Sequence, residues 1–128
     1  MTTADAIFDS VIGLMFAEAS DKEDYRDGFI RILNMVLEEC FEVNNALRRK
    51  RGREELEEPP VIAAAEDPVP YEFELTRSVI PYGVAGTLYV DDDETGISNV
   101  YRERYAEGLA ETGYMYPDAV KEVWYHGG

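Results

Sequence analysis

Apolar residues recur at helical spacing along much of this 128-residue chain. From Thr3 to about Ala19 they recur at the spacing of one helix face, which predicts a first helix. The run Ser20-Asp21-Lys22-Glu23 then has the form of a capping box that opens a second helix. This second pattern continues to about Arg51, just before Gly52, a residue typical of helix ends. Two amphipathic helices are therefore expected in this half of the chain.

Prolines interrupt the periodicity after the second helix. Four of the six prolines lie in residues 53–72: Pro59, Pro60, Pro68 and Pro70. Proline removes a backbone donor and disfavours helix at the residue before it. The segment 53–72 is therefore predicted to be a loop or extended arm, in which the apolar stretch 61–65 either forms a strand of a small hairpin or lies against a neighbour.

The second half predicts two further helices. Helical spacing over residues 72–89 is interrupted by Pro81 and Gly83, which predicts a kink or two short helices. After the polar run 91–94 the spacing returns and continues to about Gly113. The expected fold is a single domain over residues 1–128, mostly α: a small bundle of about four helices with a Pro-rich extended loop or short hairpin between helices two and three.

Acidic side chains dominate the composition, with 27 Asp and Glu against 12 Lys and Arg and a formal net charge of −15. The first 53 residues carry 8 basic and 10 acidic side chains, whereas residues 54–128 carry 4 and 17. This excess opposes binding to a phosphate backbone, so no sequence-specific nucleic-acid partner is expected. Five basic residues form one run: Arg48, Arg49, Lys50, Arg51 and Arg53. They either complement the dipole at the end of the second helix or contact an acidic surface of another copy.

The sequence carries no sign of a membrane or export segment. No window approaches 18 uncharged apolar residues, and the first residues show no basic region or small-residue cleavage site. The single cysteine, Cys40, excludes an intrachain disulfide and a thiolate-based zinc site, and it fits a reducing compartment. Cytosolic synthesis without a membrane partner is expected.

One acidic motif points to an enzyme. Residues 38–42 (EECFE) match the E-E-x-x-E pattern with which all-α nucleoside-triphosphate pyrophosphohydrolases of the MazG type hold magnesium. Carboxylates at i and i+4 share a helix face, and oxygen ligands suit magnesium. These enzymes also need an E-x-x-D on a following helix, and this chain's E-x-x-D, Glu18 to Asp21, lies upstream. A magnesium-dependent hydrolase using Glu38, Glu39 and Glu42 stays as an alternative.

Other chemical motifs are incomplete. Residues 91–96 agree with the first half of a calcium loop, but the twelfth position is Arg102, where a bidentate glutamate would close the shell. The lone histidine, His126, has no triad, and no glycine-rich nucleotide-binding motif occurs. We therefore expect no catalytic residues, no metal and no cofactor.

The tail, residues 113–128, is rich in aromatic side chains with a polar tip. Such side chains are favoured at protein interfaces, although they also cap small cores. Tyr116, Trp124 and Tyr125 are therefore predicted to dock on a neighbouring protein.

Three stretches together resemble a known group of proteins: LEECFEVNNALRRKRGREELEEPPVI, PYEFELTRSVIPYGVAGTLYVDDDE and YRERYAEGL. They are similar to small helical proteins encoded among the head and tail genes of tailed bacteriophages, the head–tail connector proteins, also called adaptor or head-completion proteins. The likeness spans residues 28–112. It implies a helical bundle with an extended loop that forms a homo-oligomeric ring of about a dozen copies beneath the portal.

The expected role is thus a structural, non-enzymatic virion protein of the phage neck, made in the host bacterial cytoplasm. It would join the portal protein to the next neck or tail-completion protein and line the DNA channel with an acidic wall that repels phosphate. The basic run is predicted to contact a subunit or the portal. The arm is predicted to lie across a neighbouring copy through six residues: Pro59, Pro60, Val61, Ile62, Pro68 and Pro70. A small acidic regulator that binds a basic partner is a second alternative.

Overall fold

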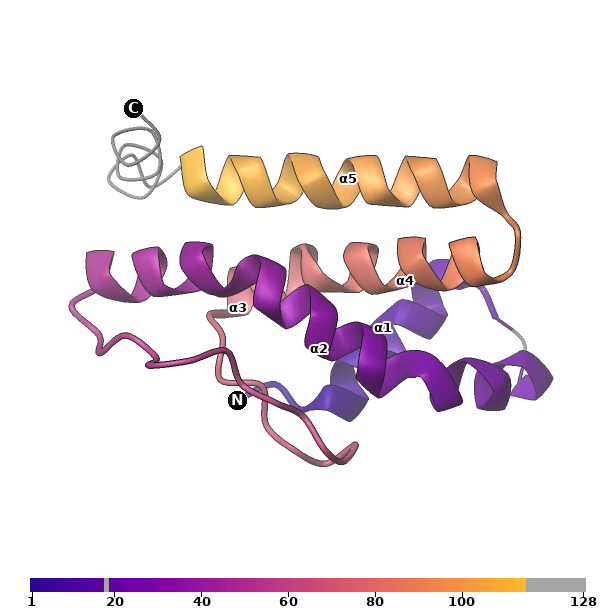
Figure 1. Cartoon of the computed structure of the whole chain (residues 1–128), viewed down its shortest axis with the longest axis horizontal. Helices are drawn as coiled ribbons and strands as arrows, with labels where there is room; N and C mark the ends of the chain where they lie inside the picture. The colour runs from indigo at the N-terminus through magenta and orange to yellow at the C-terminus, as the bar shows by residue number, and fades with distance from the viewer. Residues whose placement is uncertain (18, 115–128) are drawn as a thin grey trace.

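The computed structural model describes residues 1–17 and 19–114, which form five helices (Figure 1). These are α1 (Ala4–Met15), α2 (Ala19–Lys50), α3 (Phe73–Ser78), α4 (Ile80–Asp91) and α5 (Thr95–Tyr114). The segment between α2 and α3 is neither helix nor strand, and the bridge it makes with the N-terminus joins Thr3 to Pro68. The prediction of a mostly α bundle of about four helices is confirmed, with the third helix divided into α3 and α4.

The first helix ends at Met15, earlier than its apolar periodicity predicts. Phe16 adopts the left-handed conformation (φ 51°), and the amide of Ala17 donates to the carbonyl of Ile12 at 3.2 Å. This is the Schellman arrangement, which normally takes glycine at the left-handed position. A residue with a Cβ costs about 1 kcal/mol there. Phe16 recovers none of this by burial, because it is 89% exposed.

Tyrosine hydroxyls from the other end of the chain complete this helix end. Tyr101 donates to the carbonyl of Leu14 at 2.7 Å, and Tyr89 donates to the carbonyl of Met15 at 3.3 Å. The last carbonyls of a helix lack partners within the helix, so these two bonds satisfy groups that would otherwise need water. They also fix α1 to α4 and α5.

The break between α3 and α4 falls at Val79, just before the residues that predicted it. Val79 is at once the last cap of α3 and the first cap of α4. Pro81 therefore lies in the first turn of α4, where its missing N–H has no helical partner to lose. The predicted kink or pair of short helices is confirmed at this position.

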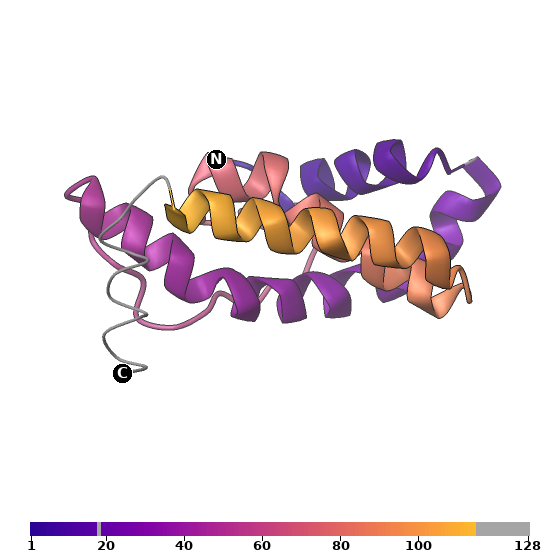
Figure 2. The same ribbon diagram turned by 90° about the horizontal axis from the view of Figure 1, so that it is seen from above.

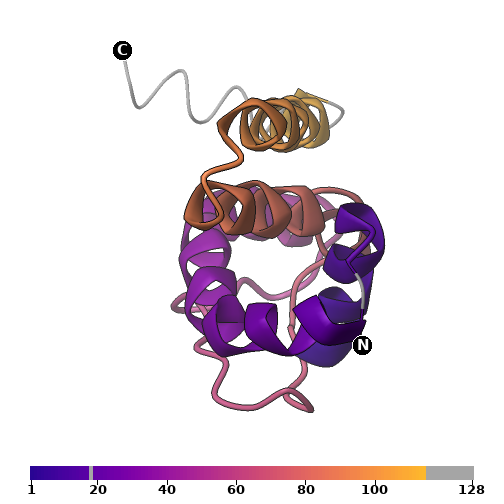
Figure 3. The same cartoon turned by 90° about the vertical axis from the view of Figure 1, so that its right-hand side faces the viewer.

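Helix α4 is the centre of the molecule. It packs against α1, α2, α3 and α5, and apolar residues cover it on every side. Seen along the long axis, α5 forms an outer layer on one side of α4, while α1 and α2 lie on the other (Figure 3). A helix that is apolar all round is stable only when it is buried in this way.

Two glycines let α5 approach α4 closely. A Cβ on Gly83 would lie 2.9 Å from ring atoms of Tyr105, and one on Gly86 would lie 2.7 Å from Cγ and 3.2 Å from the backbone nitrogen of Arg102. Ser98, buried in the same contact, donates to the carbonyl of Gly86 at 2.7 Å. The two helices are therefore held at a distance that only glycine permits.

No helix in the described ranges has the length and apolar character needed to cross a membrane.

We expect Gly86→Ala to lower the free energy of unfolding by about 1 to 3 kcal/mol, because the added methyl group displaces the backbone of α5. Gly13→Ala is the matched control, since a Cβ at this helical position meets nothing within 4 Å. Alanine at position 13 should stabilise by about 0.5 to 1 kcal/mol. Urea unfolding followed by circular dichroism measures both, and equal effects would contradict the close contact.

Candidate functional site

The Pro-rich arm, residues 53–72, lies along its own α2 (Figure 1). The side chain of Asn34 accepts a hydrogen bond from the backbone amide of Ile62 at 2.8 Å and donates one to the carbonyl of Ile62 at 3.0 Å. Asn45 makes the same pair of bonds with Leu56, both at 2.9 Å. Each asparagine side chain thus binds both the N–H and the C=O of one arm residue, as a neighbouring strand would do in a sheet. The arm is extended without belonging to a sheet.

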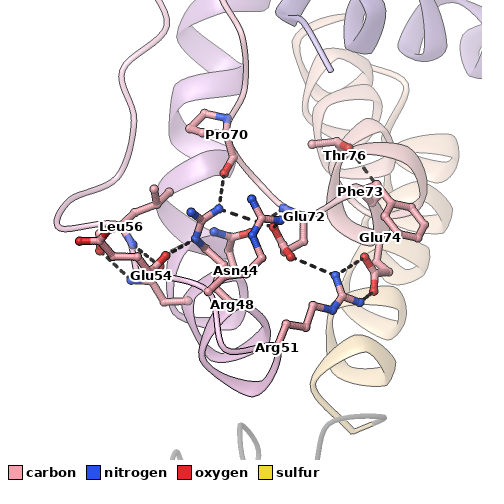
Figure 4. A network of polar contacts seen from close by, with 12 residues as sticks. Asn44, Arg48, Arg51, Glu54, Leu56, Pro70, Glu72, Phe73, Glu74 and Thr76 are labelled. Atoms are coloured by element: carbon pink, nitrogen blue, oxygen red, sulfur yellow. Dashed lines mark hydrogen bonds and ion pairs between the residues drawn. The ribbon is translucent and has the colours of Figure 1, made fainter. Parts of the chain in front are cut away.

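The arm ends at a buried carboxylate, Glu72, whose side chain is 3% exposed (Figure 4). Three arginines surround it: Arg53 at 2.8 Å, Arg51 at 3.0 Å and Arg48 at 3.6 Å. Its backbone amide donates to Oδ1 of the buried Asn44 at 2.7 Å. A buried charge is costly unless opposite charges and hydrogen bonds surround it, and this environment provides both.

Arg48 also holds both ends of the arm. Its Nε donates to the carbonyl of Glu54 at 2.5 Å, and one of its terminal nitrogens donates to the carbonyl of Pro70 at 3.4 Å. The planar guanidinium has five donors in a rigid fork, so one side chain can serve several acceptors. We call Arg48, Arg51, Arg53, Asn44 and Glu72 the arm anchor.

The basic run predicted for a subunit or portal contact therefore has partners within the chain. Besides the arm anchor, Arg51 pairs with Glu74, and Arg49 lies 3.4 Å from Glu55. Lys50 is exposed at the end of α2. These contacts neutralise much of the run, and its role in an interface stays a prediction.

The arm residues predicted to contact a neighbour differ in their exposure. Ile62 is buried in the core of its own chain, and Val61 beside it is 81% exposed. Pro59, Pro60 and Pro70 are half-buried and Pro68 is exposed. The arm thus packs within its own subunit and leaves Val61 and Pro68 at the surface.

The carboxylates of the magnesium alternative lie on α2 with little around them. Glu38, Glu39 and Glu42 are exposed, and the hydroxyl of Tyr105 donates to Glu39 at 3.1 Å. Among residues 1–17 and 19–114, no group of three or more acidic, histidine or cysteine side chains is placed to hold a metal ion. The magnesium-dependent hydrolase stays an untested alternative.

Cys40 is a free cysteine on the buried side of α2. Its Sγ is 3.5 Å from the hydroxyl of Tyr105. Burial raises the pKa of the thiol to about 11, and the same burial raises the pKa of Tyr105. Since the thiolate is the nucleophile, this environment holds the sulfur in its unreactive form.

The run that resembles half a calcium loop forms the turn between α4 and α5. Asp93 adopts the left-handed conformation (φ 61°), and Asp92 accepts a hydrogen bond from the hydroxyl of Tyr25. That contact and burial raise the pKa of Tyr25. The remaining predicted site residues, Tyr116, Trp124 and Tyr125, lie outside the described residues.

The sequence did not reveal Glu72 or the asparagines as important positions. One signal was available, because Asn34, Asn44 and Asn45 lie on α2 among its apolar positions. An amide on the apolar side of a helix must find a hydrogen-bond partner when buried. Such residues mark where a non-helical segment crosses the helix.

No protein-family model matches this sequence, no curated protein matches it, and no solved structure matches its fold.

We expect Glu72→Gln to lower the free energy of unfolding by about 1 to 3 kcal/mol, because it removes the buried charge that Arg48, Arg51 and Arg53 face, while these side chains, 14% to 54% exposed, keep part of their hydration. Glu55→Gln is the matched control, since Glu55 and its partner Arg49 are each 46% exposed, and it should cost less than about 1 kcal/mol. Urea unfolding gives both values. Limited proteolysis should cut within residues 53–72 faster in Glu72→Gln, and unchanged cutting would contradict the anchoring role.

Cys40 should not react with a thiol reagent at pH 7 in the folded protein and should react fully in urea.

The raised pKa of Cys40 also makes the stability of the protein depend on pH. Above the unfolded thiol's ordinary value of about 8.5, the unfolded state loses its proton before the folded state does, so stability should fall as pH rises from about 9 towards 11. Cys40→Ala should make this fall shallower, chiefly below pH 10, because tyrosines with a raised pKa, such as Tyr105, add their own fall above the ordinary tyrosine value of 10.0. An unchanged slope between pH 9 and 10 would contradict the assignment.

Proposed function

We propose that this protein is a structural, non-enzymatic component of a tailed-bacteriophage virion, a head–tail connector that forms a ring between portal and tail and lines the DNA channel. The resemblance over residues 28–112 first points to this role. The helical bundle with an extended arm is the architecture which that resemblance implies.

The observation that carries the proposal is the internal neutralisation of the basic run. Arg48, Arg51 and Arg53 face Glu72, and Arg49 faces Glu55. Phosphate binding depends on cations that can displace counterions from DNA, and these guanidinium groups already have carboxylate partners. An acidic chain whose main basic cluster is paired in this way suits a channel through which DNA must slide.

The fastened arm supports the same role. An extended segment of 20 residues (53–72) would be costly to order in a free subunit unless its polar groups had partners. The asparagine pairs and the arm anchor provide those partners. The subunit thus has a defined surface to offer to neighbours before it assembles.

Light scattering and negative-stain images across a concentration series, with and without the portal protein, test the proposal. We expect rings of about a dozen copies, and no measurable binding to double-stranded DNA at physiological salt. A chain that stays monomeric in every sample and never binds the portal would contradict the connector function. Hydrolysis of nucleoside triphosphates that is lost in the triple variant E38A/E39A/E42A would instead favour the enzyme.

A further inference from the structure

Phe16 combines an unfavourable backbone conformation with an exposed side chain. It occupies a left-handed position that favours glycine, and its ring is 89% exposed. A bulky residue with positive φ is an outlier, and such outliers gather where function requires them. In the isolated subunit the aromatic ring gains nothing that offsets the strain.

The backbone that precedes Phe16 is nevertheless held in a defined place. The hydroxyls of Tyr89 and Tyr101 bind the last carbonyls of α1, and the rings of these tyrosines are 5.4 Å apart. The residue therefore stands on a rigid corner where α1, α4 and α5 meet. A side chain presented in this way is suited to enter a preformed pocket.

The same chain has an open pocket of about 540 Å³ at the other end of α1. Its lining comes from the N-terminus, the first turns of α1, and α3, and it includes Met1, Ser10, Phe73 and Arg77. Met1 and Phe73 are among the largest exposed apolar side chains, and the guanidinium of Arg77 stands 5.7 Å from the centre of the Phe73 ring. The lining is about equally polar and apolar, and the Phe73 ring and the Arg77 cation within it can both contact an aromatic ring.

Phe16 cannot reach the pocket of its own chain. Ser10 lines the pocket and Phe16 follows the end of the same rigid helix. In Figure 2, α3, α1 and the segment after α1 lie in a row along one edge of the molecule. The pocket and Phe16 therefore lie towards opposite ends of α1 along this edge, so Phe16 of one copy can enter only the pocket of another copy.

The charges of the two ends also match. Asp21 and Asp24 are exposed on the first turns of α2, close in sequence to Phe16, and Tyr25 of this helix joins the acidic turn 91–94 through Asp92. The pocket contributes the exposed cation of Arg77. Complementary charge favours one orientation of approach.

We infer that copies of this chain associate head to tail, with Phe16 of one copy inserted into the pocket formed by α1 and α3 of the next. Repeated in one direction, such a contact closes into a ring or continues as a filament, whereas two copies that exchange it reciprocally form a closed dimer. Wild-type chains that stop at the dimer would overturn the head-to-tail arrangement. The inference rests on the proposed function in one respect, since it supplies a contact for the expected ring.

Two variants each remove one side of the contact. Phe16→Gly removes the aromatic ring and relieves the strain, so its melting temperature should rise by about 3 to 6 °C while self-association weakens at least about tenfold. Ser10→Trp fills the pocket from an exposed helical position and should weaken self-association similarly. Met35→Gln, which changes another exposed apolar side chain on α2, is the control and should associate as the wild type does.

The decisive experiment mixes the two variants and measures mass by sedimentation velocity. Phe16→Gly keeps an intact pocket and Ser10→Trp keeps an intact aromatic ring, so together they should form a one-to-one complex that grows no further. No complex in the mixture, or wild-type chains that stay monomeric up to millimolar concentration, would overturn the inference.

Two outcomes separate this contact from the connector function. Rings that persist in both variants would leave the connector function standing and overturn the contact. A one-to-one complex from the mixture, with no binding of any form to the portal protein, would support the contact and contradict the connector function.

Discussion

The buried carboxylate of Glu72 is the interaction on which the rest of the structure depends. It lies where the arm ends and α3 begins, and of its partners Arg48 lies in the last turn of α2 and Arg51 directly follows that helix. One charge therefore fixes three elements relative to one another. Because a charge at 3% exposure is stable only with its partners in place, the arm has a single path along α2. The direction of α3 and α4 follows from that path.

This anchoring also determines what the surface presents. The run 48–53 is the densest basic stretch of the sequence, and on a free helix end it would form a positive patch. The arm contributes Glu55 and Glu72 and α3 contributes Glu74, so the cations face carboxylates of their own chain. The two interpretations of the run, helix capping and partner contact, both omitted this third possibility. Some of the acidic residues in 54–128 therefore stabilise the fold by pairing with the basic run.

Periodicity alone predicted most of the fold, because α1, α2 and α5 each carry a local apolar pattern and α4 is marked by Pro81. What could not be predicted depends on contacts between distant residues. The end of α1 at Met15 involves hydroxyls of Tyr89 and Tyr101. The identity of the buried carboxylate among 27 acidic residues depends on where the arm returns to α2. No local signal distinguishes Glu72 from Glu74.

The arm and the pocket are linked through the same anchor. Asn34 and Asn45 bind the backbone of Ile62 and Leu56 in the arm, so in the inferred contact the arm would act indirectly. It holds α3, which begins one residue after Glu72 and carries Phe73 and Arg77 into the wall of the pocket. A subunit whose arm is loose would lose the shape of that wall although Phe16 remained in place. In the inferred contact, the receiving surface would therefore depend on the ion pairs of the basic run, although the guanidinium groups of this run contact their own chain.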